Sequence, residues 1–277
     1  MEKITSTKLI IKACDELGLK YSYGSKDKVV ITIHYLNFNH LIINFNLGLI
    51  TGSLAHLCLD KAYQVEFFKD QINIPKTNSY LDPQGKYSSM GKHNHVKNIL
   101  KNIKEKFSFP IIIKKNKGSE GEGVFLSHND NQLINAVRNT FDHKNKDYDY
   151  VLIAQQYIRP KAEYRAVFYK QKLEILYRKN NDKSTFTGNL SPLHFEGSTA
   201  VDITDKEKIK KITNFIKPIF KKINLEYAGF DIIEDKNKKL WLIEINSAPA
   251  YVHYLENNSD DKVIKLFKKI LSDLNKQ

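Results

Sequence analysis

Cysteine is scarce in this chain, with only Cys14 and Cys58 among 277 residues. Two thiols cannot build a disulfide framework, and their separation does not match the spacing of a metal-binding motif. The first 19 residues contain six charged side chains, so they lack the unbroken apolar core of a secretory signal. Both absences predict a protein of the reducing cytoplasm, and the cysteines imply no redox chemistry.

Charge is missing from one long segment, residues 29–59, which contains no Asp, Glu, Lys or Arg. A run of that length raises the possibility of a membrane span. The segment also contains four asparagines, and two of them alternate with Ile43, Phe45 and Leu47. Because such alternation is typical of half-buried strands, we expect strands here and no membrane partner.

Arginine is also scarce, because the 44 basic residues include only four arginines, and the net charge is +13. This charge is compatible with nucleic acid, an anionic membrane or acidic small molecules as partners. Asparagine and isoleucine are also abundant, so the lysine excess indicates a general compositional bias, and no nucleic-acid-binding motif is recognisable. Three of the four arginines nevertheless fall within residues 159–178, and arginine suits bidentate binding of phosphate or carboxylate.

The chain does contain enough apolar sequence, 41% of its residues, to build a substantial core. Helical and strand periodicities alternate along it, which predicts an α+β (α/β) fold. The predicted helices cover residues 6–18, 60–70, 96–107, 130–141, 206–223 and a C-terminal segment. The predicted strands lie near residues 28–35, 38–45, 109–115, 124–127, 150–155, 164–170 and 172–178, with a hairpin over residues 228–245. Residues 80–95 and 179–197 are predicted loops.

A glycine-rich loop, K-N-K-G-S-E-G-E-G-V, follows a strand that ends on Lys114. Glycines let backbone N–H groups approach phosphate oxygens without a Cβ in the way, and Lys114 would place a positive charge beside them. The loop is not a Walker loop, because no G-K-[ST] follows and no helix begins there. A flexible hairpin turn is an equally good interpretation of the loop taken alone.

The second candidate site is the hairpin that contains G-F-D-I-I and L-W-L-I-E-I-N. Glu244 and Asn246 are two apart on a strand, so both project from one face. If the turn closes symmetrically about Asn237 and Lys238, Asp231 lies directly opposite Glu244. Two facing carboxylates are destabilising without a cation, and a few carboxylate and amide oxygens suit Mg²⁺. A solvated polar face is the alternative, but it does not explain the apolar flanks.

A third block, V-L-I-A-Q-Q-Y-I, is followed by Glu163 and Arg165. A strand that leads into an extended connector offers backbone groups for an adenine edge, and Glu163 is available for ribose hydroxyls. Taken alone, this pattern is weakly specific.

The order of these three blocks resembles the ATP-grasp superfamily over residues 54–256, and L-D-K-A-Y-Q-V-E-F-F-K-D-Q-I-N-I-P-K-T resembles the "DK … GIPVP" segment of its ligases. The resemblance implies that Lys61 and Lys114 bind the ATP phosphates. It assigns Ser119, Gly121 and Gly123 to the phosphate lid. It assigns Gln155, Gln156, Tyr157 and Ile158 to the adenine hinge, Glu163 to the ribose, and Asp231, Glu244 and Asn246 to one or two Mg²⁺ ions, or Mn²⁺.

Within the superfamily, E-Y-R, L-Y-R, F-T-G-N-L and E-I-N-S-A-P-A resemble RimK-type glutamate ligases, and A-H-L-C-L-D-K is similar to cyanophycin synthetase and bifunctional glutathione synthetases. This resemblance places Arg178 and Asn189 near the transferred phosphate and the acyl substrate, with Arg165 or Arg178 stabilising the oxyanion. It implies an ATP-grasp fold of two α+β subdomains that clamp ATP, with a short N-terminal lobe at residues 1–55 and the ATP-grasp domain at residues 56–277. Within that domain the lid subdomain would cover about residues 95–157 and the C-terminal subdomain about residues 158–277.

Three features depart from the usual pattern of this family. The N-terminal lobe is short, Ala250 replaces a common glycine, and residues 80–95 form an insertion. His93 and His95 lie in that insertion without a third ligand, so solvated loop histidines are the simpler interpretation. His253 and Tyr251 follow the metal strand and either line the substrate pocket or, for Tyr251, pack in the core.

The implied reaction is ATP-dependent ligation of a carboxylate to an amine through an acyl phosphate, on an amino acid or peptide. We expect small-molecule or peptide substrates, no nucleic-acid partner and a possible homo-oligomer. Two alternatives stay open at this stage: an ATP-grasp phosphotransferase acting on a small anionic substrate, and a non-catalytic ATP-binding scaffold.

Overall fold

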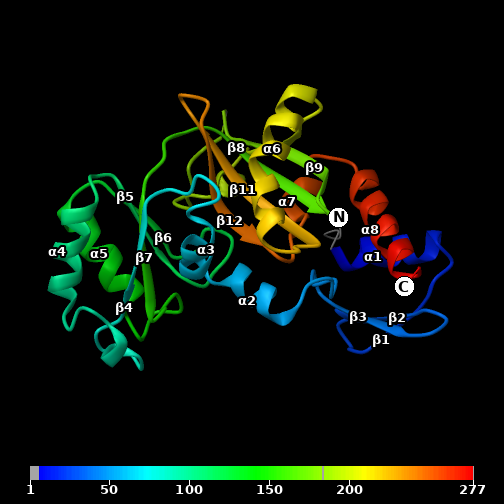
Figure 1. Cartoon of the computed structure of the whole chain (residues 1–277), viewed down its shortest axis with the longest axis horizontal. Coiled ribbons are helices and arrows are strands. Elements are labelled where there is room, and N and C mark those ends of the chain that lie inside the picture. Colours follow the sequence, from blue (N-terminus) through cyan, green and yellow to red (C-terminus); the bar gives the residue numbers. More distant parts are fainter. Residues whose placement is uncertain (1–5, 183, 277) are drawn as a thin grey trace.

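The structure, a computed structural model, describes residues 6–182 and 184–276 and contains three antiparallel sheets with helices packed on their faces (Figure 1). The helices are α1 (Ser6–Glu16), α2 (Gly52–Leu59), α3 (Lys61–Phe68), α4 (Val96–Lys106), α5 (Asp130–Thr140), α6 (Lys206–Lys222), α7 (Val252–Leu255) and α8 (Asp261–Leu274), with short 3-10 turns η1 (Ser88–Met90) and η2 (Pro192–His194). The strands are β1 (Lys20–Tyr23), β2 (Val30–His34), β3 (Asn39–Ile43), β4 (Thr77–Leu81), β5 (Ile111–Lys115), β6 (Val124–Ser127), β7 (Val151–Gln156), β8 (Pro160–Tyr169), β9 (Lys172–Asn180), β10 (Thr199–Asp202), β11 (Tyr227–Asp235) and β12 (Leu240–Asn246).

The N-terminal part combines α1 with the sheet β1-β2-β3, and both pack against the C-terminal helix α8 (Figure 1). The predicted strands near 28–35 and 38–45 are confirmed, but the alternation that follows them does not continue a strand. Asn44 turns the chain with a φ of 52°, and α2 begins after Thr51, whose hydroxyl caps the backbone N–H of Leu54. Among the described residues, no helix is long and apolar enough to cross a membrane.

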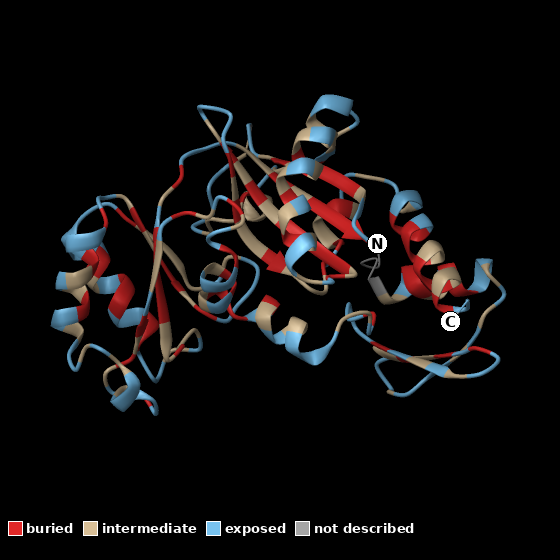
Figure 2. Cartoon of the chain, viewed as in Figure 1, coloured by how far each residue is buried: buried red, intermediate tan, exposed pale blue. Residues whose placement is uncertain are grey.

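The second sheet, in the order β4-β7-β5-β6, carries α4 and α5 on one face. Figure 2 shows the buried stripe of each helix turned toward the strands and its exposed side turned outward. The opposite face of this sheet carries Lys114 and Gln155 toward the third sheet. The sheet begins at Thr77, ahead of the lid boundary expected near residue 95, because β4 pairs with β7 as an edge strand. The first residues of the predicted loop 80–95 therefore belong to β4.

The third sheet, in the order β10-β9-β8-β11-β12, has a helix layer on each side. On one face α6 buries Ile212, Ile216 and Ile219, spaced at helical intervals, against Phe168 and Phe230. Each fully buried isoleucine contributes about 2 kcal/mol of hydrophobic stabilisation. The other face packs on α1 and α8 at one end and is polar at the other end.

The hairpin of β11 and β12 contains a bulge that sets the register of the polar end. Near the turn Ile232 pairs with Leu242, but Asp231 pairs with Glu244, so Ile243 is an extra residue on β12. The predicted pairing of Asp231 with Glu244 is confirmed. Next to the turn, each β11 residue pairs with the β12 residue one position before its predicted partner. The extra residue Ile243 removes this shift, so the predicted pairs are found beyond it.

A second bulge lies in β9. Phe168 pairs with Leu173, whereas Val167 pairs with Ile175, so Glu174 is extra. A bulge reverses the face presented by all residues beyond it relative to a regular pairing. Lys179 therefore faces the polar end of the sheet together with Arg165 and Asp231.

Candidate active site

The helix α3 delivers Lys61 to the space between the second and third sheets. Asp60 caps the helix by accepting from the backbone N–H of Tyr63 at 2.9 Å, which fixes Lys61 in the first turn. Gln64 joins the helix to β12, accepting from the Ile245 N–H at 2.9 Å and donating to the Ile245 carbonyl at 3.3 Å. Lys61 is buried, and its Nζ lies 3.4 Å from a carboxylate oxygen of Glu244.

Lys114 approaches from the opposite side, on β5 of the second sheet. It is 5% exposed, and its Nζ donates to Gln155 Oε1 at 3.0 Å. Burial, together with repulsion from Lys61, lowers the pKa of Lys114 to about 8. Two buried ammonium groups that repel each other are unfavourable without an anion between them, so this arrangement favours the binding of a polyanion.

Asp231 lies at the centre of the polar end of the third sheet. Arg165 donates two hydrogen bonds to its carboxylate at 2.8 and 2.9 Å, and Lys179 Nζ lies 2.7 Å from it. These two cations hold the pKa of Asp231 at about 2 against the opposing effect of burial. The carboxylate therefore stays ionised at every physiological pH.

The three predicted metal ligands lie together, as the sequence predicted. Asp231 and Glu244 are direct register partners, and Asn246 Nδ2 lies 3.4 Å from Asp231. In the part of the chain that the structure describes, no group of three or more His, Cys, Asp or Glu side chains could hold a metal ion. Two carboxylates and an amide oxygen fit Mg²⁺, which binds few protein ligands and completes its shell with water and phosphate oxygens. Their role as ligands stays a prediction.

The predicted adenine hinge follows β7. Ile158 is buried, Tyr157 is half-buried, and the backbone N–H of Gln156 donates to Lys76 at 2.8 Å. Beside the hinge, Glu163 faces the same side of the third sheet as Lys179. Burial raises the pKa of Glu163 to about 7, with Lys179 opposing the shift.

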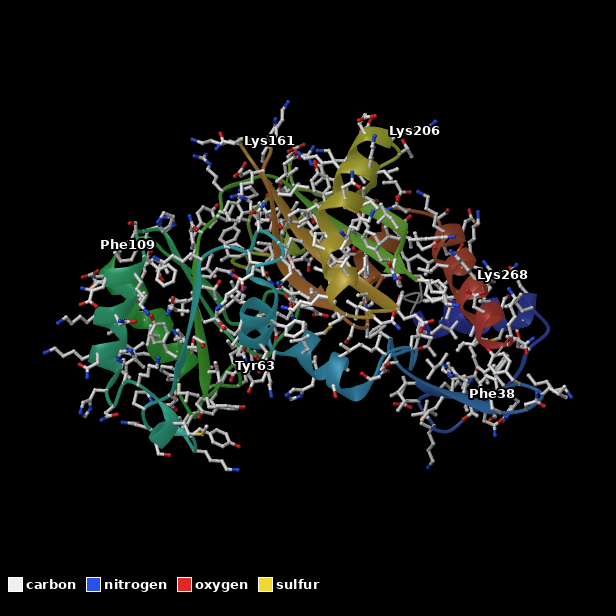
Figure 3. All side chains as sticks on the ribbon, in the orientation of Figure 1. Phe38, Tyr63, Phe109, Lys161, Lys206 and Lys268 are labelled. Atoms are coloured by element: carbon white, nitrogen blue, oxygen red, sulfur yellow. The ribbon has the colours of Figure 1, made fainter. Side chains whose placement is uncertain are left out.

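A small apolar cavity separates the two sheets beside Lys61 and Lys114. The residues Gln64, Val65, Ile74, Ile153, Gln155, Leu242 and Ile243 complete its lining. A separate groove of about 780 Å³ lies between α3, β4 and the predicted insertion, and Tyr63 on its α3 side is labelled in Figure 3. His93 lines that groove next to Tyr80, and the carboxylates of the site do not contribute to it.

The glycine-rich loop reaches across the site to the segment that contains Asn189. Lys61 Nζ donates to the Gly118 carbonyl at 2.7 Å, and Asn189 Nδ2 donates to the Glu120 carbonyl at 2.7 Å. Gly121 has a φ of +74°, and a Cβ at this position would lie 2.1 Å from Asn189 Oδ1. The close approach requires glycine, and it places the predicted phosphate lid, with Ser119 exposed at its tip, against Asn189.

Arg178 lies apart from the other predicted site residues. It pairs with Tyr164 and Val201 and so points to the α6 face of the sheet, where its Nη2 donates to Asp182 at 3.1 Å. Sequence reasoning missed its neighbour Lys179, which is 8% exposed and contacts Asp231. The bulge at Glu174 causes the exchange, because a regular hairpin would have placed Arg178 opposite Glu163.

Tyr251 is a core residue, since it is buried and its hydroxyl lies 2.6 Å from that of Tyr227. Of the two interpretations given for this side chain, core packing is therefore confirmed. The pair contributes to the core that the third sheet shares with α8.

The chain matches the family model of the RimK-like ATP-grasp domain over residues 76–273. It is 25% identical over 162 residues to the D-alanine–D-alanine ligase of Buchnera aphidicola subsp. Schizaphis graminum (strain Sg), which corresponds to 56% of this chain and 49% of that protein. The chain thus spans about half the length of this curated relative.

Solved structures share the fold. The D-alanine–D-alanine ligase of Bacillus anthracis superposes with a TM-score of 0.54 at 15% identity, covering 78% of this chain and 65% of that one. The VanG D-Ala:D-Ser ligase of Enterococcus faecalis superposes with a TM-score of 0.53 at 16% identity, covering 71% and 54%. The predicted ATP-grasp fold is thereby confirmed.

Proposed function

This chain belongs to the RimK-like ATP-grasp family, and we propose that it is an ATP-dependent ligase that joins a carboxylate to an amine through an acyl phosphate. The observation that carries the proposal is the convergence of buried cations from helix α3 and from the second and third sheets. Lys61, Lys114 and Lys179 are each less than 10% exposed and, with Arg165, surround Asp231 and Glu244. Even when Glu163, which faces the same side, is counted as ionised, four cations face three carboxylates, which leaves an excess of positive charge that a nucleotide polyphosphate would neutralise.

In this proposal the two sheets clamp ATP. Lys61 and Lys114 bind the phosphates, backbone N–H groups of the loop from Ser119 through Gly121 to Gly123 cover them, and Glu163 accepts from a ribose hydroxyl. Gln155, Gln156, Tyr157 and Ile158 form the adenine hinge, next to the apolar lining of the cavity. Asp231, Glu244 and Asn246 would hold one or two Mg²⁺ ions, which when bound offset the charge that develops on the phosphoryl oxygens.

The residues of this chain need only position and stabilise the reacting groups. A substrate carboxylate oxygen attacks the γ-phosphorus, the bond to the β–γ bridging oxygen breaks, and ADP leaves with that electron pair. The amine nitrogen then bonds to the acyl carbon while the carbon–oxygen bond to phosphate breaks. We assign the stabilisation of the oxyanion to Arg165 and Lys179, which both contact Asp231. Arg178, the other arginine expected in this role, faces the α6 side of the sheet.

The substrates that we propose are amino acids or short peptides, in keeping with the D-alanine–D-alanine ligase that the chain resembles. Their identity, the expected cytoplasmic location and a homo-oligomeric state all stay predictions.

Acid-dependent ADP release tests the proposal directly. A panel of L- and D-amino acids and dipeptides is incubated with MgATP, with and without hydroxylamine, and products are identified by mass spectrometry. We expect ADP release with particular acids, a hydroxamate when hydroxylamine is present, and an amide when a second amino acid replaces it. A phosphorylated product without hydroxamate would instead support a phosphotransferase. ATP binding without any turnover would support a scaffold.

A further inference from the structure

Two histidines lie against each other next to the cation cluster. His194 ends η2 and His253 lies in α7, yet their ring centroids are 4.7 Å apart in an edge-to-face arrangement. Both are half-buried, and His253 Nδ1 lies 3.3 Å from Glu256 Oε2. The segment that contains His194 follows Asn189 along the chain, and the segment that contains His253 follows Asn246. Both histidines therefore lie on segments that lead directly out of the candidate site.

The backbone around His194 is fixed in place. Its N–H donates to Ser191 at 3.0 Å, and its carbonyl accepts from the Thr187 hydroxyl at 2.8 Å. Through Asn189, the same loop holds the phosphate lid at Glu120. The imidazole is therefore held on a loop that contacts the predicted lid.

Four charged or titratable groups act on the His194 ring: His253 in α7, Glu120 in the lid, Lys179 in β9 and Glu256 after α7. Burial, followed by repulsion from His253, lowers the pKa of His194, and Lys179 adds to this effect. Glu120 and Glu256 act in the opposite direction. At neutral pH the ring is therefore unprotonated and can accept a proton.

The proposed ligation requires such an acceptor. An amino acid reaches the site as an ammonium ion, which has no lone pair and cannot attack the acyl carbon. Arg165 and Lys179 beside Asp231 are cations, and Asp231 is a very weak base because its pKa is about 2. Glu163, whose pKa burial raises to about 7, is the group proposed to bind the ribose. A neutral imidazole at the edge of this cluster is a suitable base.

We propose that His194 is the general base that takes one proton from the ammonium group of the amine substrate, and that His253 and Glu256 lead this proton to solvent. The freed lone pair forms the carbon–nitrogen bond as the carbon–oxygen bond to phosphate breaks. The second proton of the nitrogen leaves with the phosphate. This inference rests on the proposed ligase function and assigns the amine substrate to the side of the site next to η2 and α7.

A comparison of two nucleophiles tests it. Hydroxylamine is uncharged near pH 7, whereas an amino acid is an ammonium ion, so only the amino acid requires the base. We expect His194→Gln in the full-length chain to form hydroxamate within about 3-fold of the wild-type rate and to form amide about 100-fold more slowly at pH 7. The deficit should shrink as the pH approaches 9.5, because bulk solvent then deprotonates the amine. His253→Gln should show a smaller loss with the same selectivity, and His128→Gln, an exposed and remote histidine, should show none.

The acid and amine for this comparison are the pair that yields an amide in the wild-type panel. Equal losses with both nucleophiles would overturn the inference and indicate a structural role for His194, and so would the absence of any loss. A selective loss in Glu163→Gln but not in His194→Gln would assign the base to Glu163 instead. If the wild type forms neither hydroxamate nor amide, the proposed ligase function itself fails.

Discussion

Arg165 and Asp231 are direct register partners on neighbouring strands, and two hydrogen bonds of 2.8 and 2.9 Å join the guanidinium to the carboxylate. Lys179 adds a third contact at 2.7 Å. Asp231 therefore has a structural function besides its predicted role as a metal ligand, because it compensates two charges that are largely removed from water. The stability of the ATP-free protein depends on the same carboxylate that would bind Mg²⁺.

Replacement of Asp231 by Asn should lower the free energy of unfolding by about 3 kcal/mol, since loss of one partner leaves buried charge uncompensated. Glu244→Gln is the matched control. Its free energy of unfolding should fall by about 1 kcal/mol or less, because the Glu244 carboxylate lies 3.4 Å from Lys61 Nζ and so forms a weaker ion pair than Asp231 does. Urea denaturation at pH 7 measures both.

Because the pKa of Asp231 is lowered, its contribution to the free energy of unfolding is complete above the ordinary pKa near 4 and disappears as the pH falls through about 2. The difference between wild type and Asp231→Asn should thus be constant from pH 5 to 8, and equal losses in the two variants would contradict the assignment.

Lys179→Met should slow ATP-dependent product formation about 100-fold, whereas Arg178→Met should leave it within about 3-fold of wild type. The physical reason is that adjacent residues on a strand face opposite sides, and only Lys179 contacts Asp231. ADP release under saturating substrates measures the effect. A larger loss in the arginine variant would place Arg178 in the site and refute the orientation described above.

ATP affinity should weaken as the pH rises above about 8, because Lys114 then loses the proton that makes it a phosphate ligand. Bound phosphate favours the charged form, so binding should be accompanied by proton uptake in this range. Titration calorimetry at pH 7, 8 and 9 in two buffers of different ionisation enthalpy measures both quantities. Lys114→Met should bind ATP about 10- to 100-fold more weakly at pH 7 and should take up no proton. Unchanged proton uptake in that variant would assign the titration to another group.

Gly121→Ala should separate the lid from Asn189, because the new Cβ would lie 2.1 Å from the amide oxygen. Gly123→Ala is a close control, since Gly123 also has a positive φ, but a Cβ there would approach no closer than 3.1 Å, to Cδ of the long Lys115 side chain. We expect faster hydrogen exchange of the loop amides and at least about 10-fold weaker ATP binding in Gly121→Ala, with smaller effects in Gly123→Ala. If the two variants behave alike, backbone strain rather than the contact with Asn189 limits the loop.

Much of the site could be predicted from strand parity. Glu244 and Asn246 share a face because they are two apart on one strand. The apolar residues that flank them and Asp231 indicated two buried strands of one hairpin, which places Asp231 beside Glu244 and Asn246. The predicted register was wrong by one residue next to the turn. The predicted pairing of Asp231 with Glu244 was still right, because the extra residue Ile243 restores the predicted register beyond it. Arg178 shows the opposite outcome, since one extra residue at Glu174 placed Lys179 on the site face. Local sequence does not reveal a bulge, because its position depends on how the whole sheet packs.

The elements that escaped prediction are short and lie at edges. The four-residue strands β1 and β10 are edge strands of their sheets, and β4 is an edge strand of five residues. None of these three strands contains a run of three apolar residues, whereas β6, a four-residue edge strand as well, was predicted from its V-F-L sequence. The helix α2 escaped because the asparagine-rich sequence before it suggested continued alternation. Long amphipathic helices such as α6 were predicted to within about one residue, because their apolar positions repeat over several turns.

The two bulges make the composition of the site depend on chain length as much as on residue identity. Deleting Glu174 or Ile243 would remove the bulge and leave the partners of the remaining residues unchanged, so Lys179 and Glu244 would stay on the site face. A single-residue insertion or deletion elsewhere in these strands would instead exchange inward and outward side chains along part of the strand. Outside the two bulge positions, a single-residue insertion or deletion within β9 or β12 should therefore change the set of inward-facing charges more than a substitution does. Aligning relatives by gap position in these strands, and not by residue type alone, would identify which of them keep the same set of inward-facing charges.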